Sequence, residues 1–385
     1  MKNLIRYWLT LVKMIMWKIE WKNNLNKDDI LFLSYDGKQY SDSPKVLSEC
    51  LHKTHPEKNL IWGLSNGIDE IPDYVKIIGR NSKDFKKTIC TAGTIITNNS
   101  INSYIPIRKK QILLNTWHGG SPTKTVGYRE SNPDPYYKYH FRIQDRKTTA
   151  ILSGSNFFTE EVIRKSFGFT KTRILEFGFP KNDVLLNDHQ DIEKKVRSFY
   201  KIDSCTGIIL YAPTFRGSAN DSSFLPGEMM LNPRKCIEWF EEKYNKKFVF
   251  LFRAHHAMKI SNMGNCIPVT DYPDMQELLC ATDFLITDYS SCMHDCSLMK
   301  KPTILYIPDY YEYMKDRGFY YEIPTMPFPY AFTPDELKKV VIDFDYDKYK
   351  REVDKYHIRI GNFESGHATK DVISWLENEW KNHDN

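Results

Sequence analysis

The apolar residues of this chain gather in short runs, and between the runs they recur with the period of a helix. Seven apolar runs mark predicted strands in the first half of the chain, at residues 30–34, 59–65, 74–79, 94–100, 111–117, 149–155 and 172–178. Helical patterns separate several of these runs, at residues 43–55, 82–93 and 156–168. Strands that alternate with helices at this spacing predict a parallel sheet with helices on both faces.

This rhythm breaks at residues 179–186 and resumes after a polar helical stretch. The second series of predicted strands lies at residues 206–214, 247–256, 266–274, 282–291 and 301–309. A chain of 385 residues is too long for one ordinary core, so two domains are expected. We therefore predict two parallel α/β domains that face each other across a cleft, at residues 28–180 and 181–385.

The first 27 residues form a separate segment with an amphipathic pattern. One face of the predicted helix is apolar and carries Leu4, Ile5, Trp8, Leu11, Val12, Ile15 and Ile19. The opposite face carries Lys2, Arg6, Lys13 and Glu20. Lys13 interrupts the apolar stretch and no small-residue cleavage site follows, so the segment is not a signal peptide, and it is too charged to span a bilayer.

Such a helix suits an anionic membrane surface, with Trp8 and Trp17 near the level of the headgroups. The alternative is a helix that packs on the protein's own body, but the basic face and the tryptophans favour the membrane. Six basic residues and one acidic residue give this segment a charge of +5, which equals the formal net charge of the whole chain. The remainder is therefore about neutral, which argues against a nucleic-acid-binding surface.

Eight cysteines are spread through apolar segments without a CxxC pair: Cys50, Cys90, Cys205, Cys236, Cys266, Cys280, Cys292 and Cys296. In a chain of this length they indicate free thiols in a reducing compartment. The grouping of Cys292, His294 and Cys296 does not have the spacing of a zinc-ligand pair, and no second pair exists. We therefore interpret these three residues as structural.

Polar or small residues follow four of the predicted strands, in the stretches NTWHGG (115–120), YAPTFRG (211–217), FRAHH (252–256) and TDYSS (287–291). Ligands of open parallel sheets bind at the carboxyl ends of strands, so these turns are expected to converge on the cleft. His118 and His255 have the side chains for general acid–base chemistry near neutral pH. Gly119, with the glycine that follows it, allows the backbone to approach a ligand closely.

The remaining polar residues of these turns suit an anionic group. Ser290 and Ser291 open a predicted helix whose N–H groups can bind phosphate, and Arg253 and Arg317 add fixed positive charge. The chain has no GxxxxGK[ST], no GxGxxG after its first strand and no HExxH. None of the residues singled out calls for a metal, so no cofactor is predicted, and Mg²⁺ is not expected to be essential.

At these positions the chain resembles the CDP-glycerol glycerophosphotransferase family of bacterial teichoic acid and capsule enzymes. The resemblance rests on ordered motifs along nearly the whole chain after residue 28: SYDGKQYSDSPK (34–45), NTWHGGSPTK (115–124), EFGFPKND (176–183), LYAPTFRG (210–217), FRAHH (252–256), LLCATDFLITDYSSCMHD (278–295), KPTILY (301–306), DRGFYYE (316–322) and GNFESGHATKDV (361–372). It implies two Rossmann-like domains in a GT-B-like arrangement, an acceptor domain at 28–180 and a CDP-donor domain at 181–385.

The family's functional residues carry over position by position. Its WHG histidine falls on His118, and its second active-site histidine, in an R-x-H-P pattern, falls on His255 with Arg253 before it. His256 stands in place of the usual proline, and the WHGGSPTK turn is one residue longer than the family's WHGTPLK. The family's serine pair falls on Ser290 and Ser291, and the arginine of its RG pair falls on Arg317.

The resemblance implies transfer of an alditol phosphate, with glycerol phosphate as the first expectation. The donor is a CDP-alditol, the acceptor is a hydroxyl of a lipid-linked or polymeric molecule at the cytoplasmic face of the bacterial membrane, and CMP is released. His118 is expected to act as the base, while Thr214 and Asp288 are added to the donor site by position alone. Two alternatives stay open: a nucleotide-sugar glycosyltransferase of the same fold, and an inactive membrane-bound scaffold of a polymer-assembly complex.

Overall fold

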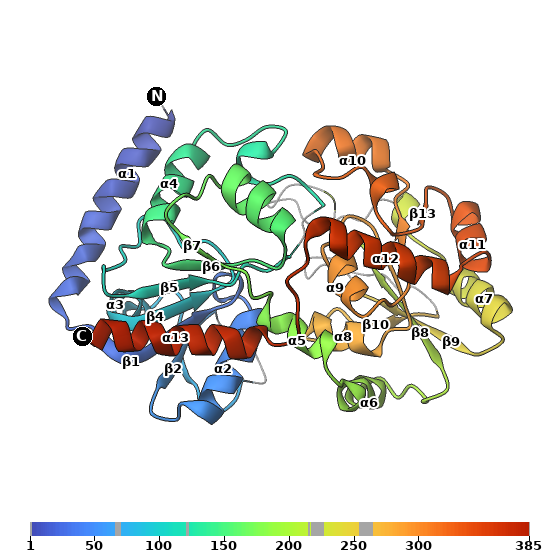
Figure 1. Ribbon diagram of the computed structural model, residues 1–385, viewed down its shortest axis with the longest axis horizontal. Coiled ribbons are helices and arrows are strands. Elements are labelled where there is room, and N and C mark those ends of the chain that lie inside the picture. Colours follow the sequence, from blue (N-terminus) through green and yellow to red (C-terminus); the bar gives the residue numbers. More distant parts are fainter. Residues whose placement is uncertain are drawn as a thin grey trace. The chain divides into compact units, whose positions relative to one another are not determined.

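The computed structural model describes residues 2–65, 71–120, 123–214, 216, 227–253 and 265–384. The chain forms two compact units, each of which contains one parallel sheet (Figure 1). Unit 1 consists of Met1–Gly120, Val126–Asp183 and Phe363–Asn385, and unit 2 consists of Ser121–Thr125 and Val184–Asn362. Two parallel sheets with interleaved helices confirm the α/β class that the sequence predicts.

The sheet of unit 1 has seven strands in the order β3-β2-β1-β4-β5-β6-β7. Their bounds are β1 Asn26–Leu33, β2 Asn59–Leu64, β3 Lys76–Gly79, β4 Ala92–Thr97, β5 Ile112–Asn115, β6 Ala150–Leu152 and β7 Arg173–Leu175. The helices are α1 Lys2–Trp17, η1 Lys18–Lys22, η2 Tyr35–Gly37, α2 Asp42–Thr54, α3 Lys83–Thr91, η3 Gly127–Arg129, α4 Tyr137–Lys147, η4 Phe158–Ser166, η5 Pro180–Asn182 and α13 Ala368–Asp384.

The sheet of unit 2 has six strands in the order β10-β9-β8-β11-β12-β13. Their bounds are β8 Gly207–Ala212, β9 Phe248–Phe252, β10 Ile267–Pro268, β11 Phe284–Thr287, β12 Thr303–Tyr306 and β13 Tyr330–Ala331. The helices are α6 Gln190–Phe199, η6 Gly227–Met229, α7 Pro233–Tyr244, α8 Met275–Ala281, α9 Cys292–Leu298, α10 Tyr310–Arg317, η7 Ile323–Thr325, α11 Pro334–Ile342 and α12 Tyr346–Ile360, while α5 Asp183–Leu186 leads into this unit from unit 1.

The central strands are buried and mostly apolar because helices cover both faces of each sheet. Every residue of β4 and β8 is buried. Along β8, Ile209 belongs to a cluster that includes Phe240 of α7, while its neighbour Ile208 belongs to a second cluster that includes Val196 of α6. Successive side chains of a strand point to opposite faces, so this alternation supports a helix layer on each side.

One predicted helix differs from the expectation in its geometry. The pattern at residues 156–168 predicts a helix, and Phe158–Ser166 forms a π-helix in that place. Its wider turns are visible in the backbone bond from the Phe167 N–H to the Val162 carbonyl, which spans five residues. The amphipathic period alone does not distinguish this geometry from an α-helix.

The units differ from the predicted domains: unit 1 includes the first 27 residues and continues to Asp183, and two further segments belong to the other unit than predicted. Helix α13 returns to unit 1, where Asp183 accepts hydrogen bonds from the N–H groups of Ala368 (2.9 Å) and Thr369 (2.8 Å). The three described residues 123–125 join unit 2, where the Tyr320 N–H donates to the Thr123 carbonyl at 3.0 Å. Both exchanges depend on partners far away in the sequence, so local patterns do not reveal them.

Helix α1 runs along the outside of unit 1 (Figure 1). It packs on this unit through polar and aromatic side chains. Arg6 pairs with Asp134 at 2.8 Å, and Thr10 shares a hydrogen bond with the Tyr136 hydroxyl at 2.8 Å. Trp17, which the sequence places near lipid headgroups, instead packs edge-on against Tyr104 (5.4 Å between ring centroids). The polar face of this helix is therefore the one that contacts the protein.

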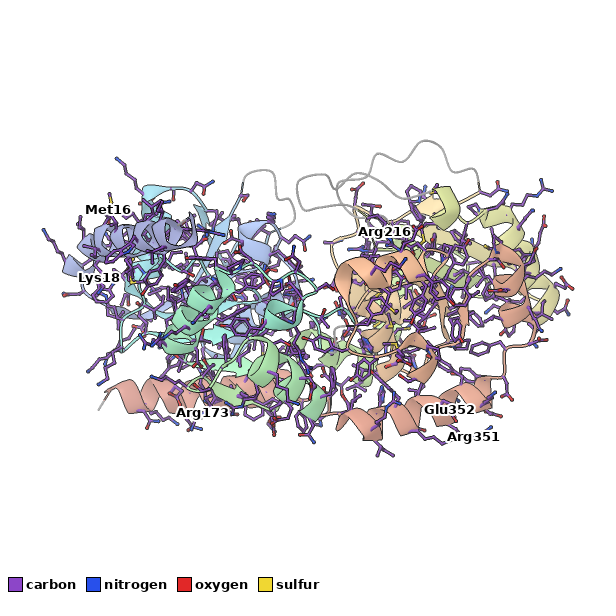
Figure 2. All side chains as sticks on the ribbon, turned by 90° about the horizontal axis from the view of Figure 1, so that it is seen from above. Met16, Lys18, Arg173, Arg216, Arg351 and Glu352 are labelled. Carbon is purple, nitrogen blue, oxygen red and sulfur yellow. The ribbon has the colours of Figure 1, made fainter. Side chains whose placement is uncertain are left out.

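The apolar side of α1 and η1 points to solvent. Eight large apolar side chains are each more than half exposed: Leu4, Ile5, Trp8, Leu9, Val12, Ile15, Met16 and Ile19. The predicted member Leu11 is half-buried, whereas Leu9 and Met16 extend the exposed face; Met16 is labelled in Figure 2. Helices of globular proteins normally bury the apolar stripe and expose the polar one, so α1 has the reverse arrangement. Among the described helices, none is both long and apolar enough to cross a bilayer.

Candidate active site

Three neighbouring strands of unit 1 end at one edge of the sheet with polar residues. Strand β5 leads to His118, β4 leads to Asn98, and β1 leads to Tyr35. The strands are adjacent in the order β1-β4-β5 and parallel, so their carboxyl ends lie together. The strand-end pattern in the sequence named only the His118 turn of these three, so Tyr35 and Asn98 are residues that the sequence analysis missed.

Among the described residues, one main-chain acceptor holds the His118 imidazole. Its Nδ1 lies 2.8 Å from the carbonyl oxygen of Asn98. A carbonyl oxygen can only accept, so Nδ1 carries the proton and the lone pair of the neutral ring is on Nε2. Burial lowers the pKa of His118 below its usual value, which the Asn98 hydrogen bond and the Asp42 carboxylate partly oppose. The ring is therefore neutral near pH 7 and suited to accept a proton at Nε2.

The turn around His118 is shaped by aromatic packing. Trp117 has a left-handed backbone (φ 52°), and its indole stacks on the imidazole at 4.7 Å and packs against Phe167 at 4.8 Å. Gly119 is buried directly after the histidine. At Gly120 an added Cβ would lie 2.8 Å from the Phe179 ring, so a side chain at that position would clash with the protein itself.

A corresponding edge exists in unit 2. Thr214 follows β8, Arg253 follows β9, Asp288 follows β11 and Asp309 follows β12. These strands are neighbours in the order β9-β8-β11-β12, and all are parallel. The polar residues after them therefore lie along one edge, as the sequence predicts for Thr214, Arg253 and Asp288.

Asp288 is completely buried, and its carboxylate is used within the protein. It accepts hydrogen bonds from the Thr214 N–H (2.9 Å) and hydroxyl (2.6 Å), from the Tyr289 N–H (2.6 Å) and from Arg216 (2.8 Å). These contacts occupy both oxygens. Asp288 therefore holds the turns that carry Thr214 and Ser290 in place, rather than presenting a carboxylate to a ligand.

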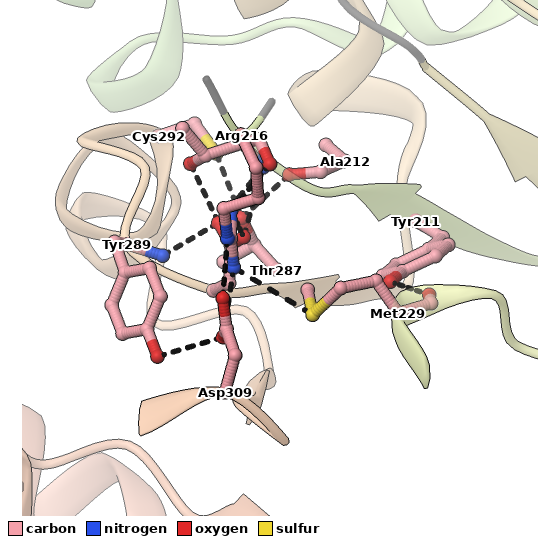
Figure 3. A network of polar contacts seen from close by, with 10 residues as sticks. Tyr211, Ala212, Arg216, Met229, Thr287, Tyr289, Cys292 and Asp309 are labelled. Carbon is pink, nitrogen blue, oxygen red and sulfur yellow. Dashed lines mark hydrogen bonds and ion pairs between the residues drawn. The ribbon is translucent and has the colours of Figure 1, made fainter. Parts of the chain in front are cut away.

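Arg216 is the centre of this network, and sequence reasoning missed it. Its guanidinium pairs with Asp309 through Nε (2.5 Å) and Nη2 (3.0 Å) and with Asp288 through Nη1 (2.8 Å), as Figure 3 shows in part. It also lies 5.1 Å from the ring centroid of Tyr289 and 4.7 Å from that of Tyr313. Burial lowers the pKa of Arg216, but the two carboxylates outweigh it and raise that pKa further, so the group is permanently charged. The sequence signal that could have identified Arg216 was its place in the YAPTFRG stretch after a predicted strand.

Ser290 and Ser291 are half-buried at the start of α9. This helix has seven residues, and the His294 N–H already donates to the Ser291 carbonyl at 3.0 Å. Ser291 does not cap the helix with its side chain. The two hydroxyl groups, rather than a long helix dipole, are therefore what this turn offers to an anion.

Of the other residues predicted for the donor site, the structure describes the side chain of Arg253 but not those of Arg317 and His255. Arg253 donates from Nη1 to the carbonyls of Tyr272 (2.8 Å) and Val269 (3.2 Å), which ties one side of its guanidinium to that loop. Arg317 ends α10, but its side chain lies outside the described part of the structure. His255 falls in residues 254–264, which lie outside the described residues.

The cysteine and histidine group at α9 is part of the packing of unit 2. His294 is buried, with Nδ1 2.9 Å from the Tyr356 hydroxyl and Nε2 3.4 Å from the Thr123 hydroxyl. Burial lowers the pKa of His294 to about 3, while Cys292 and Cys296 belong to a buried apolar cluster. No disulfide joins any of the eight cysteines, all of which the structure describes. Within the described ranges, no three or more His, Cys, Asp or Glu residues are grouped so as to hold a metal ion.

Two parallel α/β sheets, each with polar residues along the carboxyl edge, define a GT-B-like transferase architecture. The chain belongs to the CDP-glycerol:poly(glycerophosphate) glycerophosphotransferase family, whose model matches residues 15–378. This match confirms the resemblance derived from the motifs. It also defines the class of enzyme, a transferase of substituted phosphate groups.

Three known proteins illustrate the similarity. The chain is 28% identical to the teichoic acid poly(glycerol phosphate) polymerase of Bacillus spizizenii, over 97% of this chain and 99% of that protein. It is 29% identical to the polymerase of the same description from Staphylococcus epidermidis, over 94% of this chain but only 52% of that protein, so it spans about half the length of that relative. A variant of the wall teichoic acid polymerase TagF soaked with CDPG superposes with a TM-score of 0.83 at 26% identity, covering 100% of this chain and 98% of that one.

Proposed function

We propose that this protein transfers glycerol phosphate from CDP-glycerol to a hydroxyl group of a lipid-linked or polymeric acceptor, releasing CMP, in the synthesis of teichoic acid or a related capsule polymer. The family membership and the polymerase relatives support this reaction. The observation that carries it is the His118 imidazole, which is neutral and has its Nε2 lone pair directed by the Nδ1 bond to Asn98.

In the proposed reaction, His118 Nε2 takes the proton of the acceptor hydroxyl. The oxygen then forms a bond to the phosphorus of the glycerol phosphate group, and the bond from that phosphorus to the oxygen of CMP breaks. CMP leaves with the electron pair of the broken bond. Phosphoryl transfer of this kind depends on in-line positioning and on neutralised charge more than on covalent help from the protein.

The donor would be held by unit 2. Thr214, Ser290 and Ser291 offer hydroxyl groups, and Arg253 and Arg317 offer positive charge for the pyrophosphate of the CDP-alditol. His255 is proposed to contact the same group, as the family resemblance implies. Asp288 is assigned a supporting role, because its oxygens already hold Thr214, Tyr289 and Arg216. In this division unit 1, with His118 and Gly119, binds the acceptor.

A donor panel tests this proposal. The purified protein is incubated with CDP-glycerol, CDP-ribitol and UDP-glucose in the presence of a glycerol-phosphate acceptor, and the released nucleotide is quantified. We expect CMP from CDP-glycerol, with less from CDP-ribitol. Release of UDP alone would favour a sugar transferase, and the absence of any turnover in a folded protein would favour the inactive scaffold.

We further propose that the exposed face of α1 docks on an anionic membrane at the cytoplasmic side, where a lipid-linked acceptor would lie. The support is the reversed amphipathicity of the helix: its polar side packs on unit 1 while Trp8, Val12 and Ile15 point to solvent. Leaving such a face in water is unfavourable by roughly 25 cal/mol per Å² of apolar surface. Lys2, Lys13 and Lys18 in the same segment supply charge complementary to anionic lipid.

This docking can be tested without removing the helix. The triple variant Trp8→Ser, Val12→Ser, Ile15→Ser alters side chains that are each more than half exposed, so the fold is expected to persist. We expect it to lose sedimentation with phosphatidylglycerol vesicles and turnover on a lipid-linked acceptor, but to retain activity on a short soluble acceptor. Ile358→Ser, at an exposed apolar residue of α12, is the matched control. If the triple variant instead changes the oligomeric state and leaves vesicle binding intact, a second copy of the chain covers this face.

A further inference from the structure

Backbone strain gathers around His118. In the described part of the chain, eight residues other than glycine have a left-handed backbone. Four of them lie in residues 35–42 or at 117: Tyr35 (φ 46°), Asp36 (φ 59°), Asp42 (φ 64°) and Trp117 (φ 52°). This conformation is unfavourable for residues with a Cβ and persists where the surroundings enforce it, often at functional sites. Asp42 combines this strain with a buried carboxylate, because only 8% of it is exposed.

Two contacts connect Asp42 to His118 through Tyr35. The Tyr35 hydroxyl donates to Asp42 Oδ2 at 3.1 Å, and the Tyr35 ring lies 5.6 Å from the imidazole between centroids. The other oxygen of Asp42 accepts from the Ser43 N–H at 2.6 Å. Asn98 completes the arrangement, because its side chain accepts from the Tyr35 N–H (2.7 Å) while its carbonyl accepts from His118 (2.8 Å).

From these contacts we propose that Asp42 is a positioning residue for His118. Its carboxylate fixes the Tyr35 ring against the imidazole, and its negative charge stabilises the imidazolium that forms when His118 accepts a proton. The proposal rests on the proposed function, in which that proton comes from the acceptor hydroxyl. It extends that function by giving a role to the strained segment at residues 35–42, which the strand-end pattern did not include.

The charges around His118 agree with this role. The charged groups that act on the imidazole are Asp42 of α2 and Lys181 of η5: burial lowers the pKa of His118 most, Asp42 raises it, and Lys181 lowers it. Lys181 is itself buried. Its main-chain N–H donates at 3.3 Å to the hydroxyl of Ser43, the residue that follows Asp42. Without Asp42, the protonated imidazole would keep the opposing influence of Lys181 and lose its favourable partner.

The chain provides a matched control for a test of Asp42. Asp36 lies on the same strained segment, and its carboxylate pairs instead with Arg80 at 2.7 Å. Asparagine tolerates a left-handed backbone, so Asp42→Asn and Asp36→Asn each remove one charge with little change of conformation. We expect Asp42→Asn to lower kcat by roughly tenfold or more, since one pKa unit of lost charge stabilisation corresponds to a factor of ten. The KM for CDP-glycerol should stay unchanged. The kcat of Asp36→Asn should stay within about twofold of the wild type, because its carboxylate pairs with Arg80 and does not act on His118.

Two readouts distinguish positioning from a purely structural effect. An NMR titration of His118 without substrate should show a lower pKa in Asp42→Asn than in the wild type. The acidic limb of the kcat/KM profile, which reports the free enzyme, should move to lower pH by the same amount. In the His118→Ala background, Asp42→Asn should have no further effect on residual turnover. Tyr35→Phe, which keeps the charge but removes the hydroxyl, should lower kcat less and leave the His118 pKa nearer its wild-type value.

An unchanged His118 pKa in Asp42→Asn would overturn the proposal, and so would an equal loss of kcat in the presence and absence of His118. If Asp42→Asn does not fold, Tyr35→Phe still decides, because an unaltered kcat in that variant contradicts the role of the ring. Failure of the proposed function is recognised separately, as wild-type protein that releases no CMP from CDP-glycerol. In that case the NMR titration still measures whether Asp42 acts on His118.

Discussion

The carboxyl edges of the two sheets differ in how they treat charge. In unit 1, a neutral imidazole rests on one main-chain carbonyl, surrounded by strained residues, and burial lowers its pKa. In unit 2, a guanidinium is enclosed by two carboxylates that raise its pKa, and every oxygen of Asp288 and Asp309 is in use. The first edge is suited to move a proton, and the second is suited to hold a fixed framework under a charged ligand. The comparison predicts that variants of the two edges fail in different ways.

Loss of the proton acceptor should produce the largest effect. We expect His118→Ala to lower kcat by roughly 10²–10⁴-fold, the usual contribution of a positioned acid or base. Affinity for CDP-glycerol, measured by calorimetry, should stay within about threefold, because the donor is assigned to unit 2 and a threefold change is below 1 kcal/mol. His52→Ala, at an exposed histidine of α2 that stacks on Tyr74, serves as the control. Loss of donor binding in His118→Ala would mean that the two edges do not divide the work as proposed.

A variant of the Arg216 network should fail through stability instead. Arg216→Met leaves Asp288 and Asp309 buried without their cationic partner, and breaking a buried pair in this way typically costs about 3–5 kcal/mol. We expect a loss of that size in urea unfolding monitored by circular dichroism. The exposed Arg234, which pairs with Glu238 one helical turn away, provides a control whose replacement by Met should change stability by less than about 0.5 kcal/mol. A stable Arg216→Met protein with weakened donor binding would assign Arg216 to the ligand rather than to the framework.

The sequence predicted the fold better than it predicted these two environments. Apolar runs separated by helical patterns located most strands to within a few residues, because buried parallel strands are mostly continuous apolar runs. The short strand β13 was missed, since Tyr330–Ala331 has too few residues to form a pattern. The return of α13 to unit 1 was missed because its contacts, such as Trp380 with Thr94 at 2.9 Å, join residues far apart in the sequence.

The candidate site was predictable in part for the same reason. Strand ends are visible in the sequence, and they led to His118, Thr214 and Ser290. The partners of these residues are not visible there. Asn98 acts on His118 through a main-chain carbonyl, which any residue type could supply. The left-handed backbone of Asp42 likewise has no signature in composition or periodicity.

Acid sensitivity of the fold gives a smaller effect, which involves both units. Burial lowers the pKa of His294 in unit 2 to about 3 and that of His140 in unit 1 to about 4. An unfolded histidine titrates near 6.5, so below that pH the unfolded state binds protons that the folded state refuses. Stability should therefore be fully present above about pH 6.5 and fall with decreasing pH, by up to about 1.4 kcal/mol per pH unit for each histidine until its folded pKa is reached.

Urea unfolding at several pH values measures this slope. His294→Gln should reduce the slope between about pH 6 and pH 4, because glutamine does not titrate there, even if the variant is less stable at every pH. His140→Gln should do the same independently, because the two histidines belong to different units. Equal slopes in the wild type and both variants would show that these imidazoles are not kept neutral by the fold.

The smallest effect is expected from metal removal, which tests the framework role of the second edge directly. Asp309 accepts from Arg216 and from the Tyr289 hydroxyl (3.1 Å), and Asp288 accepts from Thr214, Tyr289 and Arg216. The carboxylates of Asp288 and Asp309 are thus committed to internal hydrogen bonds and to a guanidinium. A metal ion would have to displace Arg216 to reach them.

A catalytic metal contributes several kcal/mol to a transition state, so loss of an essential metal would lower kcat by orders of magnitude. If arginines neutralise the pyrophosphate instead, excess EDTA should change kcat by no more than about twofold. The control is EDTA saturated beforehand with Mg²⁺ at the same ionic strength. A complete loss of CMP release in EDTA, restored by one divalent ion, would show that a metal neutralises the charge at the donor edge. The comparison of the two edges would then have to include that metal.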